Sequence, residues 1–241
     1  MIGCWRRWRR RNPGAPVWRL LLWESIRHIA FLAMFLAYRV RSFGHRNVPA
    51  DGPVLLLCNH QSYLDLLALG SALPHRHFFA MARKTLFRSR HFGGLIRGLN
   101  AFEVDQERGD IRAIRTAIEL LKAGQMVLIF PEGSRTPDGT VQGFQEGVML
   151  LIRRARPTIV PAALEGPYDA WPIGRKRPRL NARVAVEFGN PIPAEELLKL
   201  DSRQVLDQLA QQIETMRLQL RERLKTQSDG RFPRSAERLT P

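Results

Sequence analysis

The strongest constraint on the fold is a series of short apolar runs, most of them bounded by turn residues or by a change of pattern. The clearest runs cover residues 54–58, 126–130 and 158–163, and weaker ones cover 77–82, 101–104 and 183–188. Runs this short are typical of strands buried in a sheet, because a buried helix needs roughly 10 residues or more. The runs therefore predict a buried β-sheet.

Helical patterns lie between or after these strands, and they cover residues 108–123, 145–155 and 202–225. In the first helix, the residues expected to share one face are Ile111, Ile114, Ile118 and Leu121. The last helix has a capping signal at Asp201 or Ser202, with Gln204 nearby. Strands that alternate with helices predict an α/β fold with a mixed, partly parallel sheet flanked by helices.

The N-terminal region has a different character. A basic stretch at residues 6–11 is interleaved with tryptophans and precedes an apolar helical segment at 17–40. The uninterrupted apolar part, 29–38, is short of the roughly 20 residues that a membrane-spanning helix needs. This pattern predicts a membrane-associated helical segment that lies in the interface or dips into it, while a solvated basic tail is the alternative. A signal peptide fits less well, because no small-residue cleavage site follows Tyr38.

These patterns divide the chain into three parts. We expect a membrane-associating segment at 1–43, an α/β domain at 44–226 and a polar tail at 227–241. The two cysteines, Cys4 and Cys58, are too few and too far apart for a disulfide framework or a cysteine-rich zinc module. The net charge of +16 indicates an anionic partner, which could be nucleic acid, a phospholipid surface or a phosphorylated small molecule.

The first cluster of reactive side chains follows the apolar run 54–58. His60 and Asp65 stand at the carboxyl end of that predicted strand, where α/β sheets tend to carry their active sites. An aspartate bound to one ring nitrogen would orient the histidine as a general base, provided that His60 precedes a helix and Asp65 begins it. Ser62 would then supply the N-cap. The alternative is structural, because Ser62-x-x-Asp65 is also a capping-box pattern.

The second cluster, Phe-Pro-Glu-Gly-Ser-Arg-Thr at residues 130–136, follows the apolar run 126–130. Arg135 could hold a phosphate bidentately, with hydroxyls and backbone N–H groups as further donors. The alternative is a tight turn closed by an ion pair between Glu132 and Arg135. The loop is neither a Walker loop nor the nucleophile elbow of a serine hydrolase, because it lacks the sequence motifs G-x-x-x-x-G-K-[ST] and G-x-S-x-G.

Together, the two clusters resemble the paired blocks of the glycerolipid acyltransferases. His60 and Asp65 match the family's H-x-x-x-x-D, and residues 130–135 match its F-P-E-G-[ST]-R. The likeness is greatest to the bacterial 1-acyl-sn-glycerol-3-phosphate (lysophosphatidic acid) acyltransferases, and it covers roughly residues 44–193, including a V-P block within 159–162. Either block alone would be a weak signal, but the pair is specific.

The resemblance implies transfer of a fatty acyl group from acyl-CoA or acyl carrier protein to the sn-2 hydroxyl of 1-acylglycerol-3-phosphate, making phosphatidic acid for phospholipid synthesis. His60 would be the general base and Asp65 would orient it. The residues expected to bind substrate are Glu132, Gly133, Ser134, Arg135 and Arg108. No metal and no cofactor is needed. The expected location is the cytoplasmic face of the inner (plasma) membrane, with the protein peripheral or monotopic.

One family block departs from its usual form, because Gln106 stands where the family carries an arginine that helps to bind the acceptor phosphate. Arg108 or Arg97 could take over that contact. The alternative is a different lysolipid acceptor, such as another lysophospholipid or a lyso-aminolipid. A more remote alternative is a non-catalytic basic protein that binds lipid or nucleic acid. The expected partners are a membrane phospholipid surface, a lysolipid acceptor and the acyl donor, and not nucleic acid.

Overall fold

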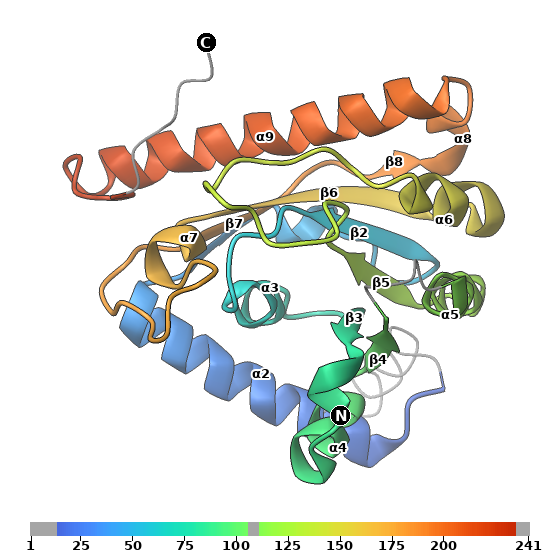
Figure 1. The fold of residues 1–241 in the computed structure, drawn as a ribbon, viewed down its shortest axis with the longest axis horizontal. Helices are drawn as coiled ribbons and strands as arrows, with labels where there is room; N and C mark the ends of the chain where they lie inside the picture. The colour runs from blue at the N-terminus through green and yellow to red at the C-terminus, as the bar shows by residue number, and fades with distance from the viewer. Residues whose placement is uncertain (1–13, 106–110, 235–241) are drawn as a thin grey trace.

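The computed structural model describes residues 14–105 and 111–234. Within these residues one 8-stranded sheet has the order β1-β7-β6-β2-β5-β3-β4, with β8 paired to β6 (Figure 1). The strands are β1 (Arg41–Phe43), β2 (Val54–Cys58), β3 (Phe79–Arg83), β4 (Ala101–Val104), β5 (Met126–Ile129), β6 (Thr158–Glu165), β7 (Ala185–Phe188) and β8 (Ile192–Pro193).

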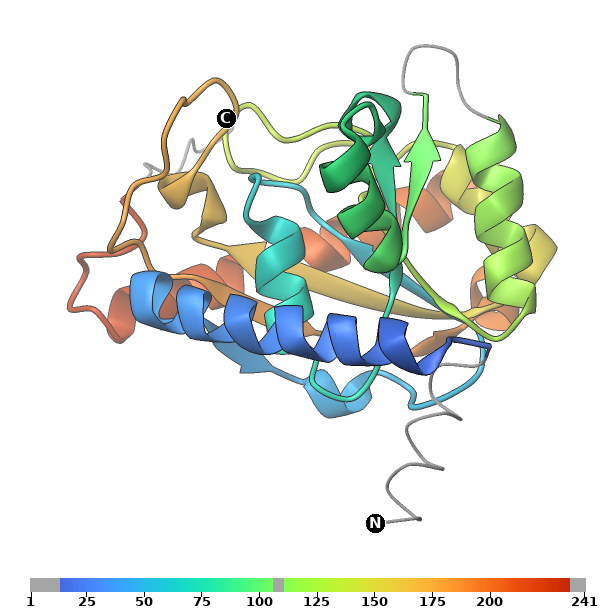
Figure 2. The same ribbon diagram turned by 90° about the horizontal axis from the view of Figure 1, so that it is seen from below.

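The helices are α2 (Val17–Tyr38), α3 (Asp65–Ala72), α4 (Arg90–Gly98), α5 (Ile111–Lys122), α6 (Gly147–Ala155), α7 (Pro167–Ala170), α8 (Ala194–Leu197) and α9 (Ser202–Thr226), with 3-10 turns η1 (His45–Asn47) and η2 (Lys84–Phe87). Helices α2 and α3 cover one face of the sheet, while α5, α6 and α9 cover the other (Figures 1 and 2). The predicted α/β fold with a mixed sheet and flanking helices is therefore confirmed.

The centre of the sheet is parallel, because β2 pairs in parallel with both β5 and β6. Strand β6 pairs antiparallel with β7 and β8. All residues of β2 are buried, and their side chains alternate between two hydrophobic cores. Val54, Leu56 and Cys58 belong to the core under α2 and α3, while Leu55 and Leu57 belong to the core under α5, α6 and α9. A strand covered on both faces explains why the run is continuously apolar.

One sequence prediction about a side-chain face is corrected at a single position. Of the four residues expected on one face of α5, Leu121 is buried and Ile114 and Ile118 pack partly buried against the core, whereas Ile111 is 73% exposed. The helix also buries Ala113 and Ala117, and Ile111 is its first residue. The predicted cap of α9 is confirmed as a capping box of Asp201 with Gln204.

Helix α2 packs along the domain rather than standing apart from it. Its buried residues include Trp23, Met34 and Tyr38, which join the same core as β2. The Trp23 ring stacks on His77 with centroids 4.7 Å apart, and His77 Nε2 lies 3.1 Å from Glu24 Oε1. By length and composition alone this helix could cross a membrane. Its buried stripe shows that one side of the helix is committed to the protein core.

The described part of the predicted tail also packs on the domain. Phe232 is buried, and its backbone N–H donates to the Ser228 hydroxyl at 3.0 Å. The Arg234 N–H donates to a carboxylate oxygen of Asp169. Residues 227–234 are therefore ordered against the end of α9 and the α7 segment.

Candidate active site

The sheet topology brings the two sequence clusters together. Strands β2 and β5 are parallel neighbours, with Leu57 opposite Ile129 in the register. The segments that follow these strands, 59–64 and 130–136, therefore leave the sheet at the same edge. The backbone N–H of Thr136 donates to the His60 carbonyl at 2.8 Å, which joins the two segments directly.

His60 and Asp65 make the contact expected of a general base and its orienting carboxylate. His60 Nδ1 lies 2.7 Å from Asp65 Oδ2, and Asp65 is completely buried. The carboxylate accepts a hydrogen from Nδ1, which leaves Nε2 of the imidazole with the basic lone pair. The His60 side chain remains 23% exposed, so the ring has access to solvent.

The same oxygen of Asp65 also closes the turn before α3. It accepts from the backbone N–H groups of Gln61 at 2.6 Å and Ser62 at 2.8 Å. The Asp65 carboxylate therefore both caps the turn before α3 and orients His60. The prediction that Ser62 caps the helix is wrong, because α3 begins at Asp65 and its N-cap is Leu64. The Ser62 hydroxyl instead accepts from the Leu64 N–H and donates to the Trp171 carbonyl at 2.7 Å.

His60 is held in place by three residues of the second cluster. Its ring stacks on Phe130, with centroids 3.9 Å apart and planes inclined by 12°. Its backbone N–H donates to Glu132 Oε1 at 2.8 Å, and its carbonyl accepts from Thr136. Both of these partners belong to the second cluster. The 130–136 loop thus positions the histidine that the first cluster supplies.

Glu132 is turned inward and is only 6% exposed. Its Oε2 accepts from the Gln142 N–H at 3.0 Å, so both carboxylate oxygens bind backbone donors. Burial raises the pKa of Glu132 to about 7, against the lowering effect of these two N–H groups. The ion pair with Arg135, considered above as the structural alternative, is not formed. The geometry gives Glu132 the task of holding His60 and the loop.

Arg135 points instead toward the aromatic ring of Tyr63. Its guanidinium carbon lies 3.6 Å from the Tyr63 ring centroid, and its Nη1 is buried without a hydrogen-bond partner. Gly133 has a positive φ of 76°, which permits the turn between Glu132 and the exposed Ser134. An arginine with unused donors at this edge of the sheet is suited to bind an anion.

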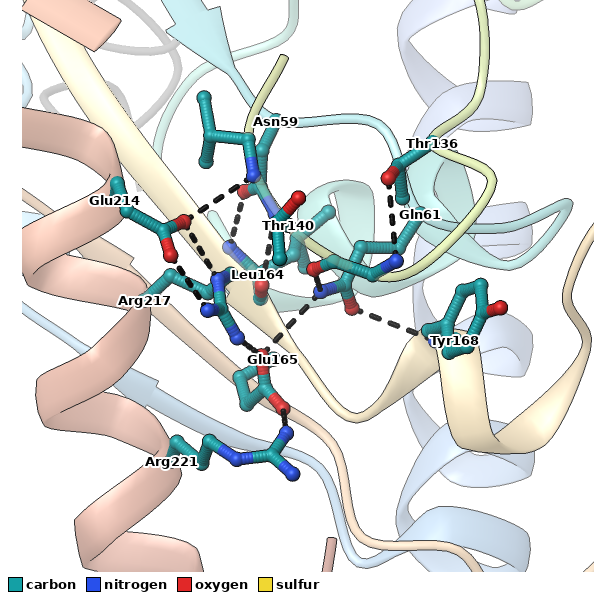
Figure 3. Close-up of polar contacts among 12 residues, drawn as sticks. Asn59, Gln61, Thr136, Thr140, Leu164, Glu165, Tyr168, Glu214, Arg217 and Arg221 are labelled. Carbon is teal, nitrogen blue, oxygen red and sulfur yellow. Dashed lines mark hydrogen bonds and ion pairs between the residues drawn. The ribbon is translucent and has the colours of Figure 1, made fainter. Parts of the chain in front are cut away.

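Two buried polar side chains beside His60 lock this edge of the sheet, and sequence reasoning missed them. The Asn59 amide binds Leu164 of β6 in both directions, at 3.0 Å and 2.7 Å. The Gln61 amide donates to the Gly139 carbonyl at 2.9 Å and to Glu165 Oε2 at 3.3 Å (Figure 3). The sequence signal that could have revealed these contacts was the pair of amide residues that follows the fully apolar run 54–58.

A buried ion-pair network continues from Gln61 to α9 (Figure 3). Glu165 is 2% exposed, and its two oxygens bind Arg217 at 2.9 Å and Arg221 at 2.7 Å. Arg217 also binds Glu214, whose Oε2 accepts from the Val141 N–H at 3.2 Å. Burial lowers the pKa of Arg217, but its bonds to Glu214 and Glu165 outweigh burial and raise the pKa above its usual value. Charged residues inside the apolar stripe of α9 were the signal that could have revealed this network.

Gln106, Arg108 and Arg97 are the positions weighed in the sequence for a phosphate contact. Gln106 and Arg108 lie outside the described residues. Arg97 binds Glu103 at 2.6 Å and lies over the Phe87 ring, so its guanidinium is already engaged near β4. Cys58 is buried in the core, as expected for a small apolar side chain, and burial raises the pKa of its thiol. Among residues 14–105 and 111–234, no group of three or more His, Cys, Asp or Glu side chains is arranged to hold a metal ion.

Comparison with known proteins agrees with this geometry. The family model described as Acyltransferase matches residues 39–165, which include both clusters. The chain is 29% identical to the 1-acyl-sn-glycerol-3-phosphate acyltransferase of Bacillus subtilis (strain 168) over 167 residues, covering 69% of this chain and 80% of that protein. It is 30% identical to the protein of the same name from Streptococcus pneumoniae over 184 residues, covering 76% of this chain and 66% of the relative.

A solved structure has the same fold. The crystal structure of the 1-acyl-sn-glycerophosphate (LPA) acyltransferase PlsC from Thermotoga maritima superimposes with a TM-score of 0.72 at 25% sequence identity. The match covers 83% of this chain and 80% of that one. The likeness therefore extends beyond the two clusters to the flanking helices and the sheet.

Proposed function

The chain belongs to the acyltransferase family, and from this membership we propose that it acylates the sn-2 hydroxyl of 1-acylglycerol-3-phosphate to make phosphatidic acid. The observation that carries the proposal is the 2.7 Å contact of His60 Nδ1 with the buried Asp65 carboxylate. That contact turns the imidazole into an oriented base with one free nitrogen. The relatives named above supply the class of acceptor.

The reaction follows from this arrangement. As the acceptor hydroxyl oxygen attacks the thioester carbonyl carbon, its proton passes to His60 Nε2. Asp65 stabilises the imidazolium that results. Collapse of the tetrahedral intermediate breaks the carbon–sulfur bond, and the imidazolium returns its proton to the departing thiolate. No side chain of the protein needs to be acylated.

The acceptor phosphate is assigned to the outer face of the 130–136 loop. Arg135 is the principal ligand in this proposal, because it carries a full charge with unused donors beside Tyr63. Gly133 and Ser134 contribute the turn and a hydroxyl next to it. We keep Arg108 as a further phosphate ligand and assign Glu132 to the positioning of His60.

The acyl donor and the location complete the proposal. The donor is a thioester of CoA or acyl carrier protein, and the product enters phospholipid synthesis. A two-tailed product belongs in a bilayer, so the enzyme works at a membrane, with α2 lying in the interface. We place it on the cytoplasmic face of the inner membrane, as a peripheral or monotopic protein.

The test is an acyl-transfer assay with the purified full chain in detergent micelles. Acyl-CoA and acyl carrier protein thioesters serve as donors, and lysophosphatidic acid, other lysophospholipids and lyso-ornithine lipid serve as acceptors. We expect turnover of lysophosphatidic acid that is lost in His60→Ala while the thermal midpoint stays within a few degrees. Inactivity on lysophosphatidic acid with turnover of another lysolipid would identify a different acceptor, the alternative that Gln106 favours. Unchanged function in His60→Ala would contradict catalysis by this site.

A further inference from the structure

Tyr63 is a large aromatic residue on the turn between His60 and Asp65, and the reaction described above gives it no task. It is 51% exposed, although its neighbours along the chain, Ser62 and Leu64, are both buried. Those neighbours are fixed by hydrogen bonds, because the Ser62 N–H donates to Asp65 Oδ2 at 2.8 Å and the Leu64 N–H donates to the Ser62 hydroxyl at 3.2 Å. The backbone of Tyr63 therefore belongs to the rigid turn that carries the general base, while its ring stays accessible.

The Tyr63 ring holds the guanidinium of Arg135. The guanidinium carbon lies 3.6 Å from the ring centroid, which is van der Waals contact between two stacked planar groups. Such a stack uses the flat face of the guanidinium and leaves its N–H donors, which lie in the plane of the group, free to bind an anion. One of these donors, on Nη1, is buried and has no hydrogen-bond partner. The ring therefore orients the arginine without consuming its hydrogen-bonding capacity.

Trp171 supports the Tyr63 ring in turn. The two rings have centroids 5.0 Å apart and planes inclined by 46°, a geometry in which aromatic side chains attract each other. Trp171 is itself fixed, because its Nε1–H donates to the Arg175 carbonyl at 2.9 Å and its backbone N–H donates to the Pro167 carbonyl at 2.9 Å. Its own carbonyl accepts from the Ser62 hydroxyl at 2.7 Å. The Tyr63 ring therefore has a rigid neighbour as well as a rigid backbone.

Arg135 needs such support, because an arginine side chain loses about 2 kcal/mol of rotamer entropy when it is held in one position. The backbone beside it is already fixed, since the Thr136 N–H donates to the His60 carbonyl at 2.8 Å. Within the described part of the chain the Arg135 guanidinium forms no ion pair, and the Tyr63 ring is the contact that restrains it. The position of the guanidinium therefore depends on the aromatic stack.

We propose that Tyr63 is a positioning residue for the acceptor phosphate, because its ring, supported by Trp171, holds the Arg135 guanidinium in place with its donors open. The proposal rests on the function proposed above and adds the residue on which selectivity for a phosphate-bearing acceptor depends. Tyr63 lies on the turn of His60, and Arg135 lies on the loop that is bonded to that turn. The stack therefore also fixes the phosphate site relative to the general base. A guanidinium ordered in advance by a cation–π contact strengthens binding by about 2- to 30-fold.

The test uses the purified full chain in detergent micelles. Tyr63→Leu removes the ring, whereas Tyr63→Phe keeps it. Phe92→Leu is the matched control, because it removes a ring that is 47% exposed on α4. Each variant is measured for thermal midpoint, for kcat, and for KM with lysophosphatidic acid and with acyl-CoA. Calorimetry without an acyl donor gives the Kd of lysophosphatidic acid and of monoacylglycerol, which lacks the phosphate. Tyr63→Leu is also combined with Arg135→Ala.

We expect Tyr63→Leu to raise KM and Kd for lysophosphatidic acid about 2- to 30-fold, while kcat, KM for acyl-CoA, the Kd of monoacylglycerol and the thermal midpoint stay unchanged. Tyr63→Phe and Phe92→Leu should match the wild type. In the Arg135→Ala background, Tyr63→Leu should have no further effect on the Kd.

Unchanged affinity of Tyr63→Leu for lysophosphatidic acid would overturn the proposal. So would equal weakening in Tyr63→Phe, equal weakening for monoacylglycerol, or the full effect on top of Arg135→Ala. A fall in kcat together with the thermal midpoint would assign the ring to the fold of the turn instead. Absence of wild-type turnover on every lysolipid, with binding that still depends on Tyr63, would contradict the proposed function alone. Absence of lysophosphatidic acid binding to the wild type would overturn both.

Discussion

The substitution Asp65→Asn separates the charge of the orienting carboxylate from its shape. The amide oxygen can replace Oδ2, which accepts from His60 Nδ1 and from the N–H groups of Gln61 and Ser62. The amide nitrogen then takes the position of Oδ1, which is buried and has no hydrogen-bond partner. The turn before α3 therefore keeps its acceptor, while His60 loses the negative charge beside it.

Two magnitudes follow from this geometry. A buried N–H donor without an acceptor costs about 1–3 kcal/mol, which lowers the thermal midpoint by roughly 2–12 °C in a domain of this size. The loss of catalysis is larger, because the imidazolium formed on His60 has no counter-charge and the amide can favour the wrong tautomer. We expect kcat to fall by about 10²- to 10⁴-fold.

The assay compares initial rates at saturating acyl-CoA and lysophosphatidic acid in micelles, below the midpoint of the variant. Asp207→Asn removes the same charge at a side chain that is 69% exposed on α9, and it should leave both rate and midpoint unchanged. If Asp65→Asn retained more than a tenth of the wild-type kcat while His60→Ala abolished turnover, the carboxylate would serve the turn alone.

Three further outcomes are expected. The neutral form of Glu132 stabilises the fold below pH 4.5, and this contribution of about 3 kcal/mol is lost as the pH rises through about 7. Glu132→Gln should therefore flatten the pH dependence of the unfolding free energy measured with urea. Parallel curves for variant and wild type would refute this. Arg217→Met should lower the free energy of unfolding, measured by chemical denaturation, by about 3–5 kcal/mol, because it leaves the buried Glu165 with one cation fewer. A coupling free energy below about 0.5 kcal/mol in a double-mutant cycle with Glu165→Gln would contradict the network. Arg135→Lys keeps the charge but loses the planar guanidinium over Tyr63. KM for lysophosphatidic acid should therefore rise about 10- to 100-fold at nearly constant kcat. A fall in kcat alone would exclude a binding role.

The strands were predictable because a fully buried strand has a local signature. β2, β5 and β6 coincide closely with apolar runs, since each is covered by helices on both faces. The capping box of α9 was equally local. Most of the buried face of α5 was also predictable, since Ile114, Ile118 and Leu121 pack on the core and only Ile111 of the predicted residues is exposed.

The partners of the site residues were harder to predict. His60 and Asp65 are five positions apart, so their contact could be expected from a turn followed by a helix. The inward direction of Glu132 could not, because it depends on N–H groups of His60 and Gln142 that are distant in sequence. Pairing with Arg135 was the nearer option along the chain, but the buried backbone donors bind the carboxylate instead.

The sequence by itself determined the α/β class, the positions of the strands and the pair of clusters that carry the chemistry, because each depends on side chains close together along the chain. The tertiary structure alone decided that β5 lies beside β2, which sets Phe130 and Glu132 against His60. It also decided that residues 171–181 run from a contact with Ser62 to a contact with Ala37 of α2, and that Glu165 meets two arginines of α9. The physical reason is that strand order and helix placement are set by the burial of both sheet faces together. These long-range contacts involve residues from the whole chain, so no short stretch of residues specifies them.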